Sequence, residues 1–187
     1  KKKVVTRVFR AKEFGSTDDL KKAFALAATE LNQRGFNIYV NLNPINSDFS
    51  GRAARDKDIA YRDLLLIDID RIGNTKQPAT DEEIEKAKDL GCSVSKYLEN
   101  LGWPNPIRVM SGNGVHLYYE LSGVDNDASS ESLIKRTINN LASRFKGPEV
   151  GIDRSVFNAS RITKVPGTIM RKGQETEERP YRMAVLF

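Results

Sequence analysis

The strongest pattern along the chain is an apolar run at residues 64–70, LLLIDID, which ends in two aspartates. A short apolar run between polar segments is typical of a strand buried in a sheet. Two further runs, at 106–110 and 115–121, predict strands joined by a tight turn at 111–114, SGNG. Further strands are predicted at 4–10, 37–43 and 181–187, and a weaker pattern at 150–153 fits a short strand.

Three helices are predicted by apolar residues at helical spacing. The first starts at 16–17, where a serine and a threonine can cap it, and ends at Gly35. The second starts after Thr80, and Glu83 three residues later completes a capping box. The third spans about 130–146, after a polar loop.

The order of the predicted elements from 64 to 153 is β-α-β-β-α-β, the split βαβ unit of ferredoxin-like and RRM-like domains. We therefore expect an α+β fold with an RRM-like unit at 61–187, whose two helices cover one sheet face and leave the other open. Residues 1–60 are expected to form an α/β extension packed against this unit. The chain 1–187 is then a single domain, expected to belong to a longer protein. Because this fold serves nucleotide chemistry as well as RNA binding, it does not decide the function.

Composition narrows the class of protein only slightly. Of the 187 residues, 39% are hydrophobic and 29% charged, with a net charge of +5, which is a globular composition that weakly favours a polyanionic partner. Cys92 is the single cysteine and His116 the single histidine, so we expect no intrachain disulfide and no structural zinc. No stretch approaches the roughly 20 apolar residues of a membrane span. We therefore expect a cytoplasmic protein without a membrane partner.

Asp68 and Asp70 lie at the end of the apolar strand, with one residue between them. Side chains of a strand alternate between its faces, so these carboxylates share a face, roughly 7 Å apart at about 3.3 Å per residue. Ile67 and Ile69 then point toward the helices. Two neighbouring carboxylates become favourable when Mg²⁺ or Mn²⁺ binds between them. The pattern is equally typical of a strand that runs into solvent, with Asp70 starting a turn.

The turn at 111–114 and the histidine after it form a second candidate site. An Asn-Gly pair between strands predicts a type I′ hairpin, and the two glycines and the serine also let backbone N–H groups approach an anion. On the following strand, alternation places His116 and Tyr118 on the face of Asp68 and Asp70. A lone histidine is usually an ordinary residue, but its place on the open face favours a functional role.

Asp153 begins the third candidate site. In a β-α-β-β-α-β unit the last strand neighbours the first, so Asp153 can complete a three-carboxylate metal site. The following segment is basic, with Arg154, Arg161, Lys164, Arg171 and Lys172. Basic side chains beside a carboxylate site suit a triphosphate, and the same run also fits a solvated loop.

Three motifs together resemble the archaeo-eukaryotic primase superfamily, in particular the primase-polymerase domains of plasmids, phages and CRISPR-linked systems. They are IDID at 67–70, SGNGVH at 111–116 and GIDRSVFNASRITKVPGT at 151–168. These families carry a DxD, an sGxGxH and a hydrophobic-Asp motif in this order, and the stretch 54–70 also resembles their lead-in to the first motif. The resemblance covers about residues 37–172.

The resemblance implies a DNA primase/polymerase that makes or extends primers by template-dependent, two-metal nucleotidyl transfer, with the RRM-like unit as catalytic palm. Its implied partners are a single-stranded DNA template, NTP or dNTP, and a helicase or other replication module of a longer, prokaryotic or mobile-element protein. Asp68, Asp70 and Asp153 would hold two Mg²⁺ or Mn²⁺ ions. The implied nucleotide contacts are Ser111, Gly112, Asn113, Gly114 and His116, with Arg161 and Lys172 on the triphosphate. Many relatives carry a zinc-binding insert, and this chain lacks its ligands.

Several alternatives stay open from the residues alone. A gap-filling repair polymerase of the same superfamily has the same motifs. A non-catalytic RRM-type module stacks bases on central-strand aromatics, and the strand 64–70 has none. A relaxase needs a histidine pair. The residues Tyr118, Tyr61 and Phe157 are candidates for sensing the 2′ position of the sugar, and the basic side chains Lys135, Arg136, Arg144 and Lys146 fit template tracking or a solvated helix face.

Overall fold

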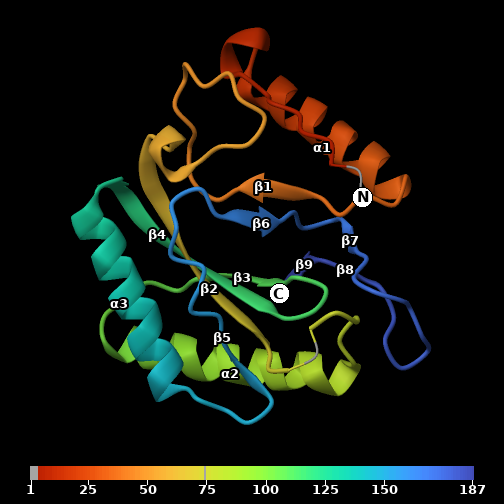
Figure 1. Ribbon diagram of the computed structural model, residues 1–187, viewed down its shortest axis with the longest axis vertical. Coiled ribbons are helices and arrows are strands. Elements are labelled where there is room, and N and C mark those ends of the chain that lie inside the picture. Colours follow the sequence, from red (N-terminus) through yellow and green to blue (C-terminus); the bar gives the residue numbers. More distant parts are fainter. Residues whose placement is uncertain (1–3, 74) are drawn as a thin grey trace.

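Three α-helices, two short 3-10 helices (Ala11–Glu13 and Asp56–Asp58) and a series of mostly short strands make up the computed structural model, which describes residues 4–73 and 75–187 (Figure 1). The elements are α1 (Thr17–Gln33), β1 (Tyr39–Asn41), β2 (Tyr61–Arg71), α2 (Asp81–Asn100), β3 (Ile107–Met110), β4 (Val115–Asp125), α3 (Ala128–Arg144), β5 (Val150–Ile152), β6 (Ile162–Lys164), β7 (Ile169–Met170), β8 (Arg182–Met183) and β9 (Val185–Leu186). In this part of the chain no helix has the length and apolar character needed to cross a membrane.

The main sheet has the strand order β5-β2-β4-β3-β9, and all its neighbours are antiparallel. Its first four strands therefore have the arrangement of a split βαβ unit, with the first strand, β2, between the last two. The predicted α+β fold is confirmed. The central pair is long: β2 and β4 are paired from Tyr61 to Ile69, with a register shift between Arg62 and Leu64.

The helix ends follow their local sequence signals. Ser16 accepts a hydrogen bond from the Asp19 N–H at the start of α1. At the start of α2, Thr80 Oγ1 accepts from the Glu83 N–H and Glu83 Oε2 accepts from the Thr80 N–H, which is the predicted capping box. Gly35 has φ +87° just after α1, so a left-handed residue ends that helix as expected.

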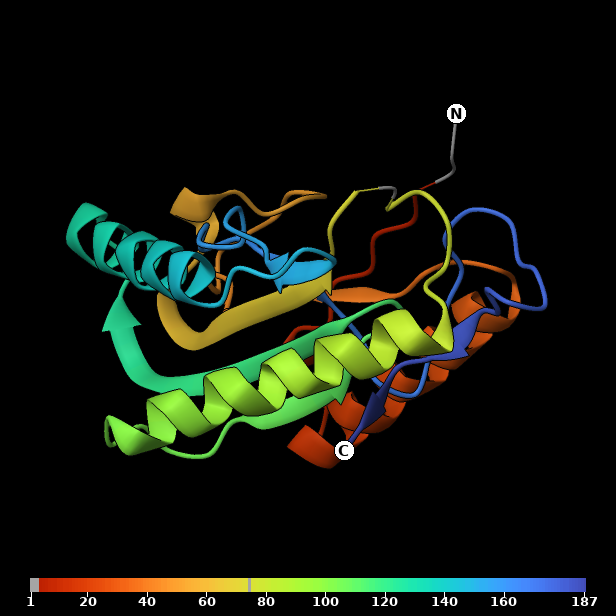
Figure 2. The ribbon, with the colours of Figure 1, turned by 90° about the horizontal axis from the view of Figure 1, so that it is seen from below.

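Helices α2 and α3 cover one face of the main sheet, and α2 runs along β2 and β4 (Figure 2). The side chains beneath α2 include Ile69, Val115 and Leu117, all fully buried. A methyl group on Gly91 of α2 would lie 3.2 Å from Val115 Cγ1 and 3.6 Å from Ile69 Cδ1. The helix backbone therefore rests closely on the sheet, which fixes the alternation of β2 with its isoleucines inward.

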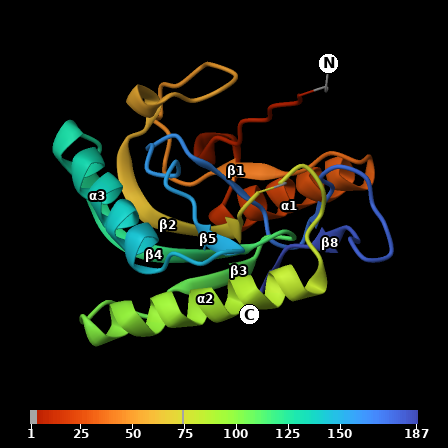
Figure 3. The same cartoon turned by 60° about the horizontal axis from the view of Figure 1, so that its bottom comes forward.

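The opposite face of the sheet is covered too, which corrects the expectation of an open face. β1 and β6 pair antiparallel and form a small second sheet over it, with α1 beyond (Figure 3). Because of this cover, residues 115–119 of β4 are buried on both sides. The residues that join α1 to the small sheet are Phe24, Ala28, Leu31, Phe36, Ile38 and Val165. The extension thus includes a strand from the far end of the chain.

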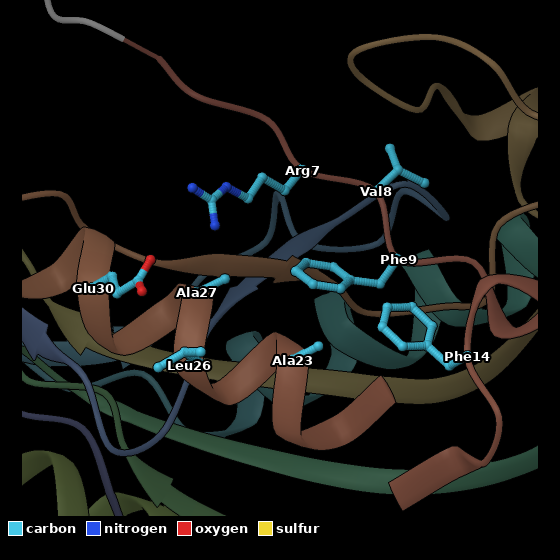
Figure 4. A pocket seen from close by; sticks show the side chains of 8 residues that line it. All are labelled: Arg7, Val8, Phe9, Phe14, Ala23, Leu26, Ala27 and Glu30. Carbon is cyan, nitrogen blue, oxygen red and sulfur yellow. The ribbon is translucent and has the colours of Figure 1, made fainter. Parts of the chain in front are cut away.

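Two of the predicted strands, at 4–10 and 181–187, differ from the structure. Within the described residues, 4–10 pair with no strand; instead the ring of Phe9 lies 5.6 Å from that of Phe24 and 6.3 Å from that of Phe14. Figure 4 shows the rings of Phe9 and Phe14 side by side. This aromatic anchor leaves an open pocket of about 420 Å³ on α1. Residues 181–187 form two short strands, because β8 pairs with β7 whereas β9 pairs with β3.

One partly buried ionic cluster ties β2, α2 and the C-terminal segment together. Glu83 Oε2 accepts from Arg71 Nη1 and from Arg179 Nη1, each at 2.8 Å. Burial acts to raise the pKa of Glu83, but hydrogen bonds from Arg179, Thr80 and Arg71 outweigh it and lower the pKa to about 2. The carboxylate is therefore held ionised at the start of α2.

Candidate active site

Asp68 and Asp70 lie at the C-terminal end of β2, on the face turned away from α2. Asp68 is paired in register with His116 of β4, and its Oδ1 is 3.4 Å from His116 Nε2. Asp70 Oδ2 is 3.8 Å from Lys172 Nζ. About a quarter of the Asp68 side chain and a third of the Asp70 side chain are exposed, at 24% and 32%, so both carboxylates can reach a ligand.

Asp153 reaches the same point from β5. Its N–H donates to the Asp68 carbonyl at 2.8 Å, directly beside β2. Its carboxylate accepts from the N–H of Ser155 at 2.8 Å and from Ser155 Oγ at 3.0 Å, which fixes the side chain in a local turn. The three acidic residues of the sequence motifs therefore come together at one edge of the covered face.

The electrostatics of Asp68 reflect this convergence. Burial, followed by the charges of Asp70 and Asp153, raises the pKa of Asp68 to about 7, although the charges of Arg161 and Lys172 oppose the shift. A carboxylate whose pKa is raised by two neighbouring carboxylates suits a divalent cation, and the hard oxygen donors of the three side chains match Mg²⁺ or Mn²⁺. As the side chains stand, no group of three or more acidic, histidine or cysteine residues in 4–73 and 75–187 encloses a metal position.

His116 is buried beside these acids in a hydrogen-bonded network. Its Nδ1 lies 2.8 Å from Tyr118 Oη, which lies 2.6 Å from Thr163 Oγ1 of β6. Burial lowers the pKa of His116 to about 4, although the charge of Asp70 opposes this shift. The imidazole is therefore neutral near pH 7. A neutral ring that accepts the Tyr118 proton at Nδ1 carries its own proton on Nε2, facing Asp68.

The SGNG turn packs tightly against the end of β2. A methyl group on Gly114 would lie 2.3 Å from the Ile69 carbonyl oxygen and 3.3 Å from Asp70 Cα, so only glycine fits there. Ser111 is buried, and its Oγ donates to the Gly114 carbonyl at 3.2 Å. Asn113 is also buried, with its Oδ1 accepting from the Ala79 N–H. The two polar side chains brace the turn, and their predicted phosphate contacts stay a prediction.

The basic residues after Asp153 divide into two groups. Arg161 hydrogen-bonds the Ser155 carbonyl and, like Lys172, acts electrostatically on Asp68. Lys164 is only 1% exposed, and its Nζ donates to Thr168 Oγ1 and to the carbonyl of Ile169. Burial, followed by the charge of nearby Arg171, lowers the pKa of Lys164 to about 8. The basic segment that follows Asp153 is therefore not simply a solvated loop, because Lys164 is buried in it.

Tyr39 was not singled out by the sequence patterns. It pairs with Lys164 across β1 and β6, is 42% exposed, and its pKa is raised by burial and by the charge of Asp68. Of the three candidates for sensing the sugar, Tyr118 is tied into the histidine network, Tyr61 lies at the far end of β2, and Phe157 packs under Lys135. No local signal marks Tyr39, because its position depends on a strand pairing across most of the chain.

Comparison with known proteins gives similar folds but no sequence match: no protein-family model and no curated protein matches the chain. It is similar to the polymerase domain of Mycobacterium tuberculosis ligase D, solved with DNA, with 19% identity and TM-score 0.49 over 79% of this chain and 52% of that one. It is also similar to the AEP domain of the cyanophage S-2L primase-polymerase, with 16% identity and TM-score 0.48 over 87% of this chain and 67% of that one. The chain spans about half of the ligase D domain and about two thirds of the cyanophage domain.

Proposed function

We propose that the chain is a primase-polymerase domain of the archaeo-eukaryotic primase superfamily, which joins nucleotides on a single-stranded DNA template. The observation that carries this proposal is the meeting of Asp68, Asp70 and Asp153 beside His116. These residues come from three separate motifs, and their order along the chain is the one the superfamily carries. A helicase or another replication module in a longer protein belongs to the same proposal.

The chemistry follows from what each side chain can hold. Asp68, Asp70 and Asp153 would hold two Mg²⁺ or Mn²⁺ ions, which supply charge neutralisation and an activated 3′-hydroxyl for nucleotidyl transfer. His116, neutral and held by Tyr118, presents an N–H donor where a phosphate oxygen can accept it. Lys172, 3.8 Å from Asp70, adds a positive charge at the same edge of the site.

Further positive charge comes from Arg161 and Arg171. The guanidinium of Arg161 is bound to the Ser155 carbonyl beside the third motif. Arg171 Nη1 is buried and has no hydrogen-bond partner among the described residues. A buried donor without a partner is costly, and a phosphate oxygen would satisfy it. Positioning and charge neutralisation of this kind supply most of the rate in phosphoryl chemistry.

The decisive experiment is synthesis on a single-stranded circular DNA without a primer, with labelled NTPs and dNTPs supplied separately and with Mg²⁺ or Mn²⁺. We expect product from the wild-type chain and none from Asp68→Ala/Asp70→Ala. The matched control is Asp48→Ala/Asp89→Ala, which removes two exposed carboxylates away from the site. Circular dichroism establishes that each variant is folded.

Three outcomes separate the alternatives. Synthesis by the folded Asp68→Ala/Asp70→Ala variant contradicts the proposal. Product that appears only when a primer is supplied identifies a gap-filling polymerase of the same superfamily. Nucleic-acid binding that persists in EDTA, with no synthesis under any condition, identifies a binding module instead. The carboxylates argue against that last reading, because acids on the sheet face repel a nucleic acid unless a cation is bound.

A further inference from the structure

A groove of about 560 Å³ runs outward from the acidic residues over β5 to the end of α3. Figures 1 and 3 both show the end of α3 beside β5, and the two elements are in contact. Asp70 and Asp153 form its inner end together with Lys172, whose ion pair with Asp70 lies at the boundary of the groove, and Ile72 lines the side made by the loop after β2. Its volume is in the range of small-ligand sites, yet none of the three sequence motifs predicted it.

Space for a ligand is created by a glycine. Gly151 of β5 is the register partner of Asp70 across β2, so the two residues share a face of the sheet. A methyl group on Gly151 would point to the Ile72 side chain, 3.4 Å from its Cδ1. Because Gly151 carries no side chain, the sheet beside Asp70 stays open on this side, whereas His116 lies on the opposite side.

The outer wall of the groove is basic. Lys146 and Arg154 line it and take part in no ion pair within residues 4–73 and 75–187. Arg154 donates to Asn139 Oδ1 at 3.4 Å and to Ser143 Oγ at 3.0 Å, which holds its guanidinium against α3 without neutralising it. Arg154, held against α3, and the exposed Lys146 are two positive charges along one groove, which suits successive phosphates of a strand.

We propose that this groove binds phosphate groups of the strand whose 3′ end is extended. The proposal rests on the proposed function, in which the nucleotide's phosphates lie on the His116 side of the acidic residues. Attacking and leaving oxygens are roughly in line in phosphoryl transfer, so the two reactants approach from opposite sides. In the order β5-β2-β4, the acids of β2 lie between the groove on β5 and His116 on β4.

The test compares Lys146→Ala/Arg154→Ala with Lys96→Ala/Arg52→Ala. Both pairs remove one lysine and one arginine, and the control residues are exposed on α2 and in the loop before β2, outside the groove. Three affinities are measured by fluorescence anisotropy as a function of salt: a labelled primer–template with a dideoxy-terminated primer, the same template strand alone, and a labelled nucleotide. The dideoxy end prevents synthesis, so the binding measurement needs no catalysis.

We expect primer–template affinity to fall about tenfold in the groove variant, and its salt dependence to fall by a slope of roughly 1.5 to 2, because two phosphate contacts are lost. Affinities for the template alone and for the nucleotide should stay at the wild-type value, as should all three in the control variant. Extension should show a raised KM for primer–template at an unchanged KM for nucleotide.

Other outcomes overturn the assignment. A loss of nucleotide affinity with primer–template binding intact would mean that the groove takes the triphosphate. If the groove variant loses as much affinity for the template alone as for primer–template, or no more affinity than the control variant, the groove does not bind the primer strand specifically. If Arg154→Ala lowers the melting temperature, Lys146→Glu alone gives the same readouts, because Lys146 belongs to no ion pair of the described chain. A wild-type chain that binds primer–template but makes no product contradicts the proposed function. In that case the binding measurements alone still decide whether the groove binds the primer strand.

Discussion

Asp68 and His116 face each other across β2 and β4, with Asp68 Oδ1 3.4 Å from His116 Nε2. Burial reverses the usual order of their pKa values, because it raises the pKa of Asp68 to about 7 and lowers the pKa of His116 to about 4. Between these values the pair keeps its proton on the carboxyl rather than on the imidazole. A cation bound at the carboxylates would take the place of that proton.

The first prediction concerns stability and pH in the absence of metal. The folded pKa of Asp68, about 7, lies above its ordinary value of 3.8, so the folded state binds more protons between these values. The Asp68 carboxyl therefore reduces stability as pH rises from about 4 to 7. We expect Asp68→Asn to unfold at a higher temperature than the wild type at about pH 8, by roughly 2–4 °C for on the order of 1 kcal/mol.

Thermal unfolding followed by circular dichroism in EDTA checks this prediction, and the difference should shrink toward pH 4. His116 acts in the opposite direction, because its lowered pKa makes stability rise with pH between about 4 and 6.5. His116→Gln is therefore the matched variant, with the opposite pH dependence. A stability difference for Asp68→Asn that is the same at every pH would show that the carboxyl is not perturbed.

The second prediction concerns nucleotide binding. His116→Ala should weaken nucleotide binding about tenfold while template binding changes little, because it removes a charge-assisted contact to phosphate. Tyr118→Phe keeps the ring but removes the hydroxyl bonded to His116 Nδ1 and Thr163, so a smaller rise in nucleotide KM is expected. Tyr97→Phe, on the other side of the sheet in α2, is the control. Equal losses of nucleotide and template affinity would rule out this role for His116.

The third prediction links the SGNG turn to the acidic residues. Gly114→Ala would place a methyl group 2.3 Å from the Ile69 carbonyl oxygen, so β2 or the turn must shift. We expect a loss of roughly 1–3 kcal/mol of unfolding free energy, typical of overpacking, together with lower synthesis at saturating nucleotide. Gly15→Ala is the control, because its nearest neighbour would be Asp19 Oδ2 at 3.5 Å. Wild-type stability in Gly114→Ala would disprove the tight packing.

The fourth prediction concerns acid stability at the start of α2. The pKa of Glu83 is lowered to about 2 from 4.5, so this carboxylate contributes stability above pH 4.5 that is lost as pH falls toward 2. Its side chain is 24% exposed, and solvent screening reduces the effect. We expect Glu83→Gln to cost on the order of 1 kcal/mol at pH 7 and nothing near pH 2, measured by urea unfolding. Glu85→Gln, two residues away in the same helix, is the control.

The elements that carry the site were predictable because their signals are local. The alternation of LLLIDID fixes which way Asp68 and Asp70 point, and the capping box at Thr80 fixes where α2 begins. Given the order of elements, the position of Asp153 beside β2 followed from topology alone. The alternation on β4 likewise put His116 on the correct face.

The rest depends on pairings between distant segments, which local patterns do not contain. β6 has three residues, and its partner β1 lies more than a hundred residues earlier, so neither the covered face nor the burial of His116 was foreseen. Residues 4–10 have the β-branched composition of a strand, but they are held by the ring of Phe9 instead. Tyr39 and the groove beside Gly151 become visible only once β1 and β5 are placed.

The pairing of β1 with β6 sets an order of events during translation. A nascent chain that has emerged only as far as α3 already contains Asp68, Asp70 and His116 but lacks Asp153 and the strand that bonds Tyr118 through Thr163. In such a chain His116 would still be exposed to solvent, and Asp68 and Asp70 would lack Asp153 beside them. Prematurely terminated products that end at α3 should therefore lack the completed acidic cluster and the cover over His116.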